Sequence, residues 1–488
     1  MDSPISLYRR SLALLTDLYE LTMAQGHWKA GTDRLETSFY MSYRLNPFGG
    51  GFSISCGLSY VVDLLGNFHF TDEDIAYLAS LRGNDGKAMF ESAFLDYLRK
   101  MTLTCDVDAV PEGTVVFPQA PMVRVTGPII QCQILETPIL NMINFQSLIA
   151  TKAARICIAA KGDPVLEFGL RRAQGVDGAL AASRAAYIGG CVGTSNVLAG
   201  QLFGIPVKGT HAHSWVMCFE SEVEAFEKYA EAMPNNCVFL VDTYNSLEGV
   251  RRATDVGKRL RQRGFELAGI RLDSGDLAYL SIEARKILNE AGFPGAKIVA
   301  SNDLDEHIIA SLKEQGAAID IWGVGTKLAT AYDQPAMGGV YKLAAVREPS
   351  GAWRHKVKLS EQSIKISNPG VLQTRRYFNA QGYIADAIYD EATGIGDGCT
   401  IVDPMDLTRR KNIPRGTAHE DLLVPVMRGG KVVHAQPHLD TIRDRARAEL
   451  SKFHVGIKRF VNPHQYPVGL ELKLWELKKE LVLHARGL

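Results

Sequence analysis

A run of short apolar segments between residues 165 and 326 constrains the fold of this chain more than any other feature. Longer stretches with apolar residues at helical spacing separate them. The segments span 165–169, 189–195, 205–213, 237–243, 267–274, 297–303 and 319–326. Short buried strands that alternate with helices are typical of a parallel sheet covered on both faces. We predict a closed (β/α) barrel, with an open doubly wound sheet as the alternative.

The parts of the chain on either side have a different rhythm. Residues 1–137 begin with a helical pattern over 12–28 and continue as short strands between Pro- and Gly-containing turns, which predicts a β-rich α+β domain. We place the barrel at 138–346. Residues 347–488 are less regular and contain a predicted C-terminal helix; we expect this region to pack partly on the N-terminal domain.

Composition excludes several classes of protein. The formal net charge is zero, which argues against binding to nucleic acid or to an anionic membrane. No apolar run approaches the ~18 residues of a membrane-spanning helix, and residues 1–10 do not resemble a signal peptide. The eight cysteines form no C-x-x-C pair and lie mostly in apolar runs. We therefore expect reduced thiols and a cytoplasmic protein.

Polar residues follow the predicted strands one after another. A single polar residue at such a place is usually a helix cap, but a succession that mixes Arg, Asp and His indicates a site. In a parallel barrel these strand ends meet on the face that carries the active site. The residues are Glu167, Arg171, Arg172, Thr194, Ser195, Thr210, His211, His213, Asp242, Arg271, Asp273, Asp276, Ser301, Asn302, Asp303, Gly323, Gly325 and Thr326.

Three of these motifs suggest particular chemistry. The segment 322–326 (WGVGT) offers consecutive N–H groups to a phosphate, or is a plain tight turn. Arg271 and Asp273 share one face of a strand, where they can bind an anion and a sugar hydroxyl or form a simple salt bridge. The segment 167–172 brings two guanidinium groups beside Phe168, whose ring suits a flat heterocycle or the core.

The histidines of 210–213 (THAH) leave several interpretations open. At i and i+2 on a strand end they share a face and could hold zinc, although no suitable third ligand is evident nearby. His213 could instead be structural, or a nucleophile or base. Asp242 ends the next predicted strand, from which it could orient the His213 ring through the other ring nitrogen.

Taken in order, these segments resemble those of the nicotinate phosphoribosyltransferase family. The resemblance spans roughly residues 14–345 and is carried by 14–28, 36–58, 136–156, 166–175, 189–200, 204–216, 241–250, 269–277, 300–306 and 322–330. It implies an irregular barrel of the type II phosphoribosyltransferase kind with a β-rich N-terminal domain and a C-terminal extension. It also implies a dimer with a shared active site.

The resemblance further implies a reaction. Nicotinate attacks C1 of phosphoribosyl pyrophosphate and gives nicotinate mononucleotide and pyrophosphate, on the way to NAD. The family couples this step to ATP hydrolysis through a phosphorylated histidine and uses Mg²⁺. Because displacement at C1 passes through an oxocarbenium-like state with a pyrophosphate leaving group, the chemistry needs charge neutralisation and positioning more than a strong base.

The same resemblance assigns roles to residues of this chain. His213 is at the position of the phosphorylated histidine, Asp242 would orient it, and Asp273 is expected at the ribose or Mg²⁺ side. The other matches, at the nicotinate site, are Tyr19 (from the neighbouring subunit), Phe168, Thr210, Arg271 and Arg171, and around the 5′-phosphate they are Ser301, Asn302, Gly323, Gly325 and Thr326. His211 matches no family role.

Four alternatives remain. A nicotinamide phosphoribosyltransferase typically carries an acidic residue where this chain has Ser195, and an acidic group there would repel a carboxylate. Quinolinate enzymes lack the phosphohistidine and are shorter. A non-catalytic barrel kept for binding would have lost His213, Arg271 or Asp273. A zinc hydrolase would use His211 and His213 and contain stoichiometric zinc.

Overall fold

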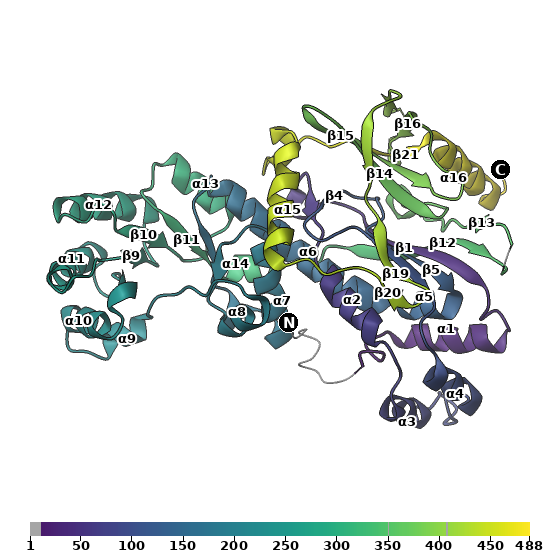
Figure 1. Ribbon diagram of the computed structural model, residues 1–488, viewed down its shortest axis with the longest axis horizontal. Helices are drawn as coiled ribbons and strands as arrows, with labels where there is room; N and C mark the ends of the chain where they lie inside the picture. The colour runs from purple at the N-terminus through teal and green to yellow at the C-terminus, as the bar shows by residue number, and fades with distance from the viewer. Residues whose placement is uncertain (1–10, 350, 407) are drawn as a thin grey trace. The chain divides into compact units, whose positions relative to one another are not determined.

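The computed structural model describes residues 11–349, 351–406 and 408–488. The chain divides into two compact units (Figure 1). Residues 149–335 form one of them. The chain before residue 149 and the chain after residue 335 together form the other, so the N-terminal and C-terminal regions share one unit. Among the described helices, none is long and apolar enough to cross a membrane.

The unit built from both ends of the chain contains a seven-stranded antiparallel sheet. Its order is β13-β12-β1-β5-β3-β19-β20. The strands are β1 (Glu36–Tyr43), β3 (Asp106–Ala109), β5 (Val123–Pro128), β12 (Gly339–Arg347), β13 (Arg354–His355), β19 (Val424–Arg428) and β20 (Lys431–Val432). Because β12 and β19 pair with β1 and β3, chain from beyond residue 335 completes the N-terminal sheet.

A second sheet of the same unit has the order β17-β16-β21-β15-β14-β18. Its strands are β14 (Leu372–Asn379), β15 (Gly382–Asp390), β16 (Cys399–Val402), β17 (Arg410–Ile413), β18 (Ala418–Asp421) and β21 (Val468–Glu471). Two short strands, β2 (Ser53–Ile54) and β4 (Val115–Val116), pair separately. The helices are α1 (Leu18–Lys29), α2 (Leu58–Asn67), α3 (Asp72–Ser80), α4 (Ser92–Lys100), α5 (Ile129–Ile134), α15 (Leu439–Lys452) and α16 (Leu472–Ala485).

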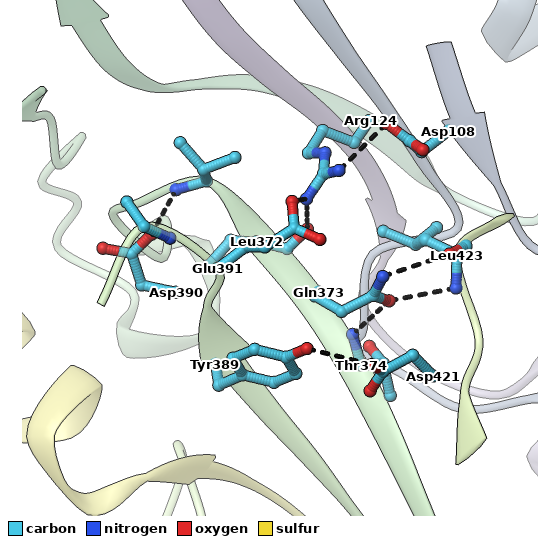
Figure 2. Close-up of polar contacts among 12 residues, drawn as sticks. Asp108, Arg124, Leu372, Gln373, Thr374, Tyr389, Asp390, Glu391, Asp421 and Leu423 are labelled. Atoms are coloured by element: carbon cyan, nitrogen blue, oxygen red, sulfur yellow. Dashed lines mark hydrogen bonds and ion pairs between the residues drawn. The ribbon is translucent and has the colours of Figure 1, made fainter. Parts of the chain in front are cut away.

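Buried polar contacts join these two sheets (Figure 2). Arg124 on β5 forms an ion pair with Asp108 on β3 at 2.9 Å and donates to the Leu372 carbonyl at the start of β14 at 3.2 Å. It also pairs with Glu391 at 2.6 Å. A guanidinium group buried among these acceptors keeps its charge compensated, so this contact fixes β5 against β14.

The other unit is a parallel sheet with the order β7-β6-β11-β10-β9-β8. Its strands are β6 (Val165–Glu167), β7 (Gly193–Thr194), β8 (Val238–Leu240), β9 (Gly269–Leu272), β10 (Lys297–Ala300) and β11 (Ile321–Val324). The two units divide within helix α6 (Glu136–Ala159). The other helices of this unit are α7 (Gly175–Ile188), α8 (Val197–Phe203), α9 (His213–Met217), α10 (Glu222–Ala232), α11 (Ser246–Gln262), α12 (Leu277–Glu290), α13 (Glu306–Glu314) and α14 (Thr326–Ala329).

The helices that follow β8, β9 and β10 begin where the sequence provides a cap. The side chains of Asn245, Asp276 and Asp305 accept hydrogen bonds from backbone N–H groups in the first turns of α11, α12 and α13. Such caps satisfy N–H groups that a helix leaves without partners. Asp276, one of the polar residues that follow the predicted strands, is therefore a helix cap.

One predicted strand is wrong. The segment 205–213 forms no strand and has only a single parallel bridge, between Val207 and Thr194 on β7. Pro206 lacks an N–H for a ladder, and the polar stretch after Val207 does not alternate apolar with polar residues. The backbone is irregular up to α9, so His213 begins a helix and does not end a strand.

Candidate functional site

A polar pocket of about 130 Å³ lies at the carboxyl ends of β6, β9, β10 and β11. All of its lining residues come from segments that the sequence analysis singled out. They are Phe168, Arg171, Arg172, Arg271, Asp273, Ser301, Asn302, Asp303, Gly323, Gly325 and Thr326. The carboxyl ends of parallel strands are where barrel enzymes bind their substrates, and this pocket is the candidate active site.

Arg271 is held at this pocket by three hydrogen bonds. Nε donates to Ser301 Oγ at 2.8 Å, Nη1 to Thr210 Oγ1 at 3.1 Å, and Nη2 to Asp273 Oδ1 at 2.8 Å. Its Cζ lies 5.8 Å from the centre of the Phe168 ring. The predicted shared face of Arg271 and Asp273 is confirmed, and the guanidinium plane is fixed before any ligand binds.

Asp273 is ionised at neutral pH. Burial favours its neutral form, but the hydrogen bond from Ser301 and the charge of Arg271 outweigh burial and lower the pKa of the carboxyl group below its usual value. Its Oδ2 lies 3.8 Å from His213 Nε2. The pocket therefore combines a fixed cation with a fixed anion.

His213 is the first residue of α9, and its side chain is 40% exposed. Its Nε2 lies 3.9 Å from Asp242 Oδ1, too far for a hydrogen bond, and its Nδ1 lies 3.1 Å from Thr243 Oγ1. Asp242 Oδ2 instead accepts from the Asp273 N–H at 2.8 Å. Sequence reasoning missed Thr243; its position beside Asp242 was the available signal.

Phe168 explains why glycine occurs at two positions of the last strand end. A Cβ on Gly323 would come within 2.7 Å of the Phe168 ring, and one on Gly325 within 3.3 Å of its carbonyl oxygen. The aromatic ring therefore lies directly on the backbone of β11, half-exposed at the pocket. Close packing thus accounts for part of the G-x-G pattern.

This contact gives a testable prediction. Gly323→Ala should displace the Phe168 ring and raise KM for the ligand that stacks on it, by about tenfold for a lost aromatic contact of ~1.4 kcal/mol. Steady-state kinetics of the variant measure this. Gly295→Ala is the matched control, because a Cβ there meets nothing within 4 Å. Equal KM values for the two variants would contradict the assignment of Phe168.

The turn after β10 has unusual backbone geometry. Asn302 and Asp303 have φ values of +97° and +36°, which residues other than glycine rarely adopt. Consecutive residues of this kind store strain, and such strain gathers at functional sites. Both residues line the pocket. The family resemblance gave Asp303 no role, although it was among the polar residues at the strand ends.

Arginines give the pocket an excess of positive charge. Arg172 Nη1 donates to Thr326 Oγ1 at 3.2 Å, whereas no hydrogen bond or ion pair is found for the Arg171 side chain among the described residues. With Arg271, three guanidinium groups face two carboxylates, those of Asp273 and Asp303. Guanidinium groups bind the planar oxygens of carboxylates and phosphates, so the pocket suits an anionic ligand.

Some of the predicted strand-end residues serve the scaffold. The buried Glu167 carboxylate accepts from Thr194 Oγ1 at 2.6 Å, from Ser183 Oγ at 2.9 Å and from the Gly169 N–H. This network fixes the turn that presents Phe168. Ser195, half-buried, donates its backbone N–H to the Glu167 carbonyl at 3.0 Å.

The two histidines do not act as a pair. His211 is buried, and its Nε2 accepts from the Leu240 N–H at 3.2 Å, whereas His213 contacts Thr243. Both ring nitrogens of His211 have backbone partners, the Ala212 carbonyl for Nδ1 and the Leu240 N–H for Nε2, which disfavours a zinc site shared by the two histidines. Within the described ranges, no group of three or more His, Cys, Asp or Glu side chains could hold a metal ion.

Tyr19 belongs to the other unit. It lies on α1, is 48% exposed, and its hydroxyl is 3.5 Å from Glu136 Oε1. Burial and the neighbouring carboxylates, Glu136 first among them, raise the pKa of its phenol, so the ring carries no charge at neutral pH. An exposed neutral ring can contact a partner, and its role in a shared site stays a prediction.

The fold and the pocket define an α/β barrel enzyme with an anion site of arginines and an aromatic platform. Comparisons with known proteins place the chain more closely. Models of the nicotinate phosphoribosyltransferase N-terminal domain, family and C-terminal domain match residues 14–144, 164–365 and 373–478. The nicotinate phosphoribosyltransferase of Bacillus subtilis is 42% identical over 97% of this chain and 95% of its own length. The chain therefore belongs to the nicotinate phosphoribosyltransferase family.

Solved structures agree with this family. The crystal structure of human nicotinic acid phosphoribosyltransferase superimposes with a TM-score of 0.82 at 32% identity, over 96% of this chain and 99% of that one. A nicotinate-nucleotide pyrophosphorylase from Pyrococcus furiosus shares the fold, with a TM-score of 0.69 at 22% identity over 93% of this chain and 98% of that one. The predicted fold class is confirmed: the barrel is irregular where 205–212 replaces a strand.

Proposed function

We propose that this protein joins nicotinate to phosphoribosyl pyrophosphate, giving nicotinate mononucleotide and pyrophosphate for NAD synthesis. The observation that carries the proposal is the fixed Arg271 guanidinium beside the Phe168 ring. Nicotinate is a flat ring that bears one carboxylate. A cation can bind the carboxylate while an aromatic side chain stacks on the ring, and Arg271 and Phe168 lie close enough together to do both. Thr210 and Arg171 complete the nicotinate site in this proposal, and Tyr19 of a second subunit covers the other ring face.

The phosphoribosyl group has its own part of the pocket. Ser301 and Asn302 lie in the turn after β10, Gly323 lies in the last part of β11, and Gly325 and Thr326 follow that strand. Glycines let backbone N–H groups approach a phosphate closely, and Thr326 adds a hydroxyl group at the start of α14. We assign the 5′-phosphate to this part.

The chemistry follows from the charges. As the bond from C1 to pyrophosphate breaks, positive charge develops on the ribose and negative charge on the leaving group. Asp273 and the arginines line the pocket; in this proposal the carboxylate stabilises the ribose and the guanidinium groups stabilise the pyrophosphate. The pyridine nitrogen attacks without losing a proton, so the reaction needs orientation and not a general base.

A divalent cation fits this site only if the phosphate oxygens of the substrate provide some of its ligands. Mg²⁺ is commonly held by one or two carboxylates together with substrate phosphates. Asp273 and Asp303 are the carboxylates that line the pocket. When bound, Mg²⁺ would neutralise the pyrophosphate charge.

ATP coupling is the finer part of the proposal. His213 would take the γ-phosphoryl group of ATP on a ring nitrogen and release ADP. Asp242 and Asp273, whose oxygens lie 3.9 and 3.8 Å from Nε2, would stabilise the cation that forms. The half-exposed ring makes this transfer sterically possible.

Assembly and location complete the proposal. We propose a homodimer, because the family resemblance assigns Tyr19 to the active site of a neighbouring subunit and the Tyr19 side chain is exposed. All eight cysteines are free, which suits a reducing cytoplasm.

Base selectivity tests the proposed substrate. The wild-type protein should form product from nicotinate and little from nicotinamide or quinolinate. Ser195→Asp should lower kcat/KM for nicotinate by about tenfold or more, since a carboxylate near the ring would repel the substrate's own. Mass spectrometry of the products with each base measures this. Preference for nicotinamide by the wild-type protein would refute the proposal.

A further inference from the structure

His211 has no part in the chemistry proposed above, yet it is more enclosed than its reactive neighbour. It is 8% exposed. Its ring centre lies 4.9 Å from that of Tyr229 and 6.1 Å from that of Phe226, both on α10, and 6.4 Å from that of Phe239 on β8. A polar ring placed among aromatic side chains needs partners for its nitrogens, because burial without hydrogen bonds is costly.

Both nitrogens of this ring face backbone groups. Nε2 lies 3.2 Å from the N–H of Leu240, the last residue of β8, and Nδ1 lies 3.3 Å from the Ala212 carbonyl oxygen. The Leu240 N–H can only donate, so Nε2 must present its lone pair and the ring proton must be on Nδ1. The imidazole is therefore an acceptor for a strand N–H group.

That N–H group lies at an end of the sheet. β8 pairs with β9 on one side, and none of the strands in the described part of the chain pairs with its other side. At the other end of the sheet, β7 bonds to the backbone of the irregular segment: Thr194 N–H donates to the Pro206 carbonyl at 3.0 Å, and Lys208 N–H to the Thr194 carbonyl at 2.9 Å. The segment 206–211 thus connects to β7 through backbone and to β8 through one imidazole.

We propose that His211 is a positioning residue: its imidazole replaces the strand carbonyl missing between β7 and β8, and so holds Thr210 and His213 at the active site. The inference rests on the proposed roles of those two neighbours. Thr210 Oγ1 accepts from Arg271 Nη1 at 3.1 Å, and His213 contacts Thr243 at 3.1 Å. Both contacts depend on where the 210–213 backbone runs.

The charges around His211 favour its neutral form. Burial lowers the pKa of the ring, and although the Ala212 carbonyl opposes this, the charges of Arg271 and His213 lower the pKa further. Tyr229, the other titratable side chain against the ring, stays neutral because burial raises its pKa. A protonated ring would turn an N–H toward the strand N–H and break the contact.

The wild-type protein provides the first test. Nitrogen-15 NMR of the histidine rings should show His211 as the neutral tautomer with the proton on Nδ1 between pH 6 and 8, and the Leu240 amide should exchange slowly with deuterium. A charged ring, the opposite tautomer or a rapidly exchanging Leu240 amide would overturn the proposal.

Two substitutions separate positioning from packing. His211→Phe keeps an aromatic ring without an acceptor, and His211→Gln keeps an acceptor at about the position of Nε2. In His211→Phe, we expect the Leu240 amide to exchange rapidly with deuterium and kcat/KM to fall by about 10- to 100-fold, the order of loss for a small misplacement of reacting groups. In His211→Gln, slow exchange of the Leu240 amide and most of the wild-type kcat/KM should return. Full activity of His211→Phe with loss in His211→Gln would show a packing role and sink the idea.

Phe226→Leu is the control for stability. It removes ring packing around His211 but leaves the acceptor, so it should lower the melting temperature and leave kcat/KM and the Leu240 amide unchanged. Absence of transferase activity in the wild-type protein would refute the proposed function, whereas ring tautomer and amide exchange judge the positioning contact by itself. If His211→Phe does not fold, the tautomer decides.

Discussion

Arg271→Ala should lower kcat/KM for nicotinate by about thirtyfold to several thousandfold, because truncating one partner of a desolvated, hydrogen-bonded charge pair costs ~2–5 kcal/mol. The side chain of Arg271 is 15% exposed and directs hydrogen bonds to Ser301, Thr210 and Asp273. The substitution removes the guanidinium group proposed to pair with the nicotinate carboxylate, and with it three internal hydrogen bonds. Steady-state kinetics with nicotinate and phosphoribosyl pyrophosphate measure the loss.

The pH dependence should change as well. Without Arg271, Asp273 loses the charge and the hydrogen bond of that arginine, both of which lower the pKa of its carboxyl group, so this pKa rises from its lowered value. If the ionised carboxylate is the active form, the acid limb of the kcat/KM profile moves to higher pH. The reverse movement would contradict the charge pairing described here.

Arg285→Lys is the matched control for this prediction. Arg285 is also a partly buried arginine of the barrel unit, bonded to Asp320 Oδ2 and to the Ala296 carbonyl at 2.9 and 2.7 Å. It lies at the opposite ends of the strands, next to the first residues of β10 and β11. The variant Arg285→Lys should lower the free energy of unfolding and leave kcat/KM unchanged. A similar loss of activity in both variants would mean that Arg271 acts through the fold.

His213→Ala should abolish the stimulation of turnover by ATP while a slow transfer without ATP continues. The reason is that the His213 side chain is the proposed phosphoryl acceptor, whereas nicotinate is proposed to bind to Arg271 and Phe168. Initial rates with and without ATP, together with ADP release, measure the effect. An ATP effect of full size in this variant would exclude His213 as the acceptor.

Thr243→Val refines this prediction. The change removes the hydroxyl 3.1 Å from Nδ1 but keeps the side-chain volume. We expect a loss of about fivefold in the ATP-stimulated rate, the value of one neutral hydrogen bond of ~1 kcal/mol. The rate without ATP should stay near that of the wild-type protein. The comparison of the two variants separates phosphoryl transfer from orientation of the ring.

Much of the barrel could be predicted from local pattern. Apolar runs next to capped helices are a local signal, and six of the seven predicted segments contain strands of the parallel sheet. The rule that strand ends meet on one face then brought Arg271, Asp273 and Ser301 together correctly. The segment 205–213 failed because its apolar residues resemble a strand, while Pro206 and the polar residues after Val207 prevent a ladder.

Other features depend on contacts that no local pattern reveals. The pairing of β12 with β1 joins residues about 300 positions apart, such as Thr37 and Val346. The local sequence of neither strand predicts which strand it pairs with. The hydrogen bond between His213 and Thr243 depends on α9 beginning at His213. The sequence showed a carboxylate at Asp242, which suggested the orienting partner, but its oxygens are directed mainly to the loop after β9.

The most direct test of the central claim is the product formed by the purified wild-type protein from nicotinate, phosphoribosyl pyrophosphate and Mg²⁺. We predict nicotinate mononucleotide and pyrophosphate in equal amounts, formed faster when ATP is added. No nicotinate mononucleotide with or without ATP, under conditions in which the protein is folded, would contradict the proposed function.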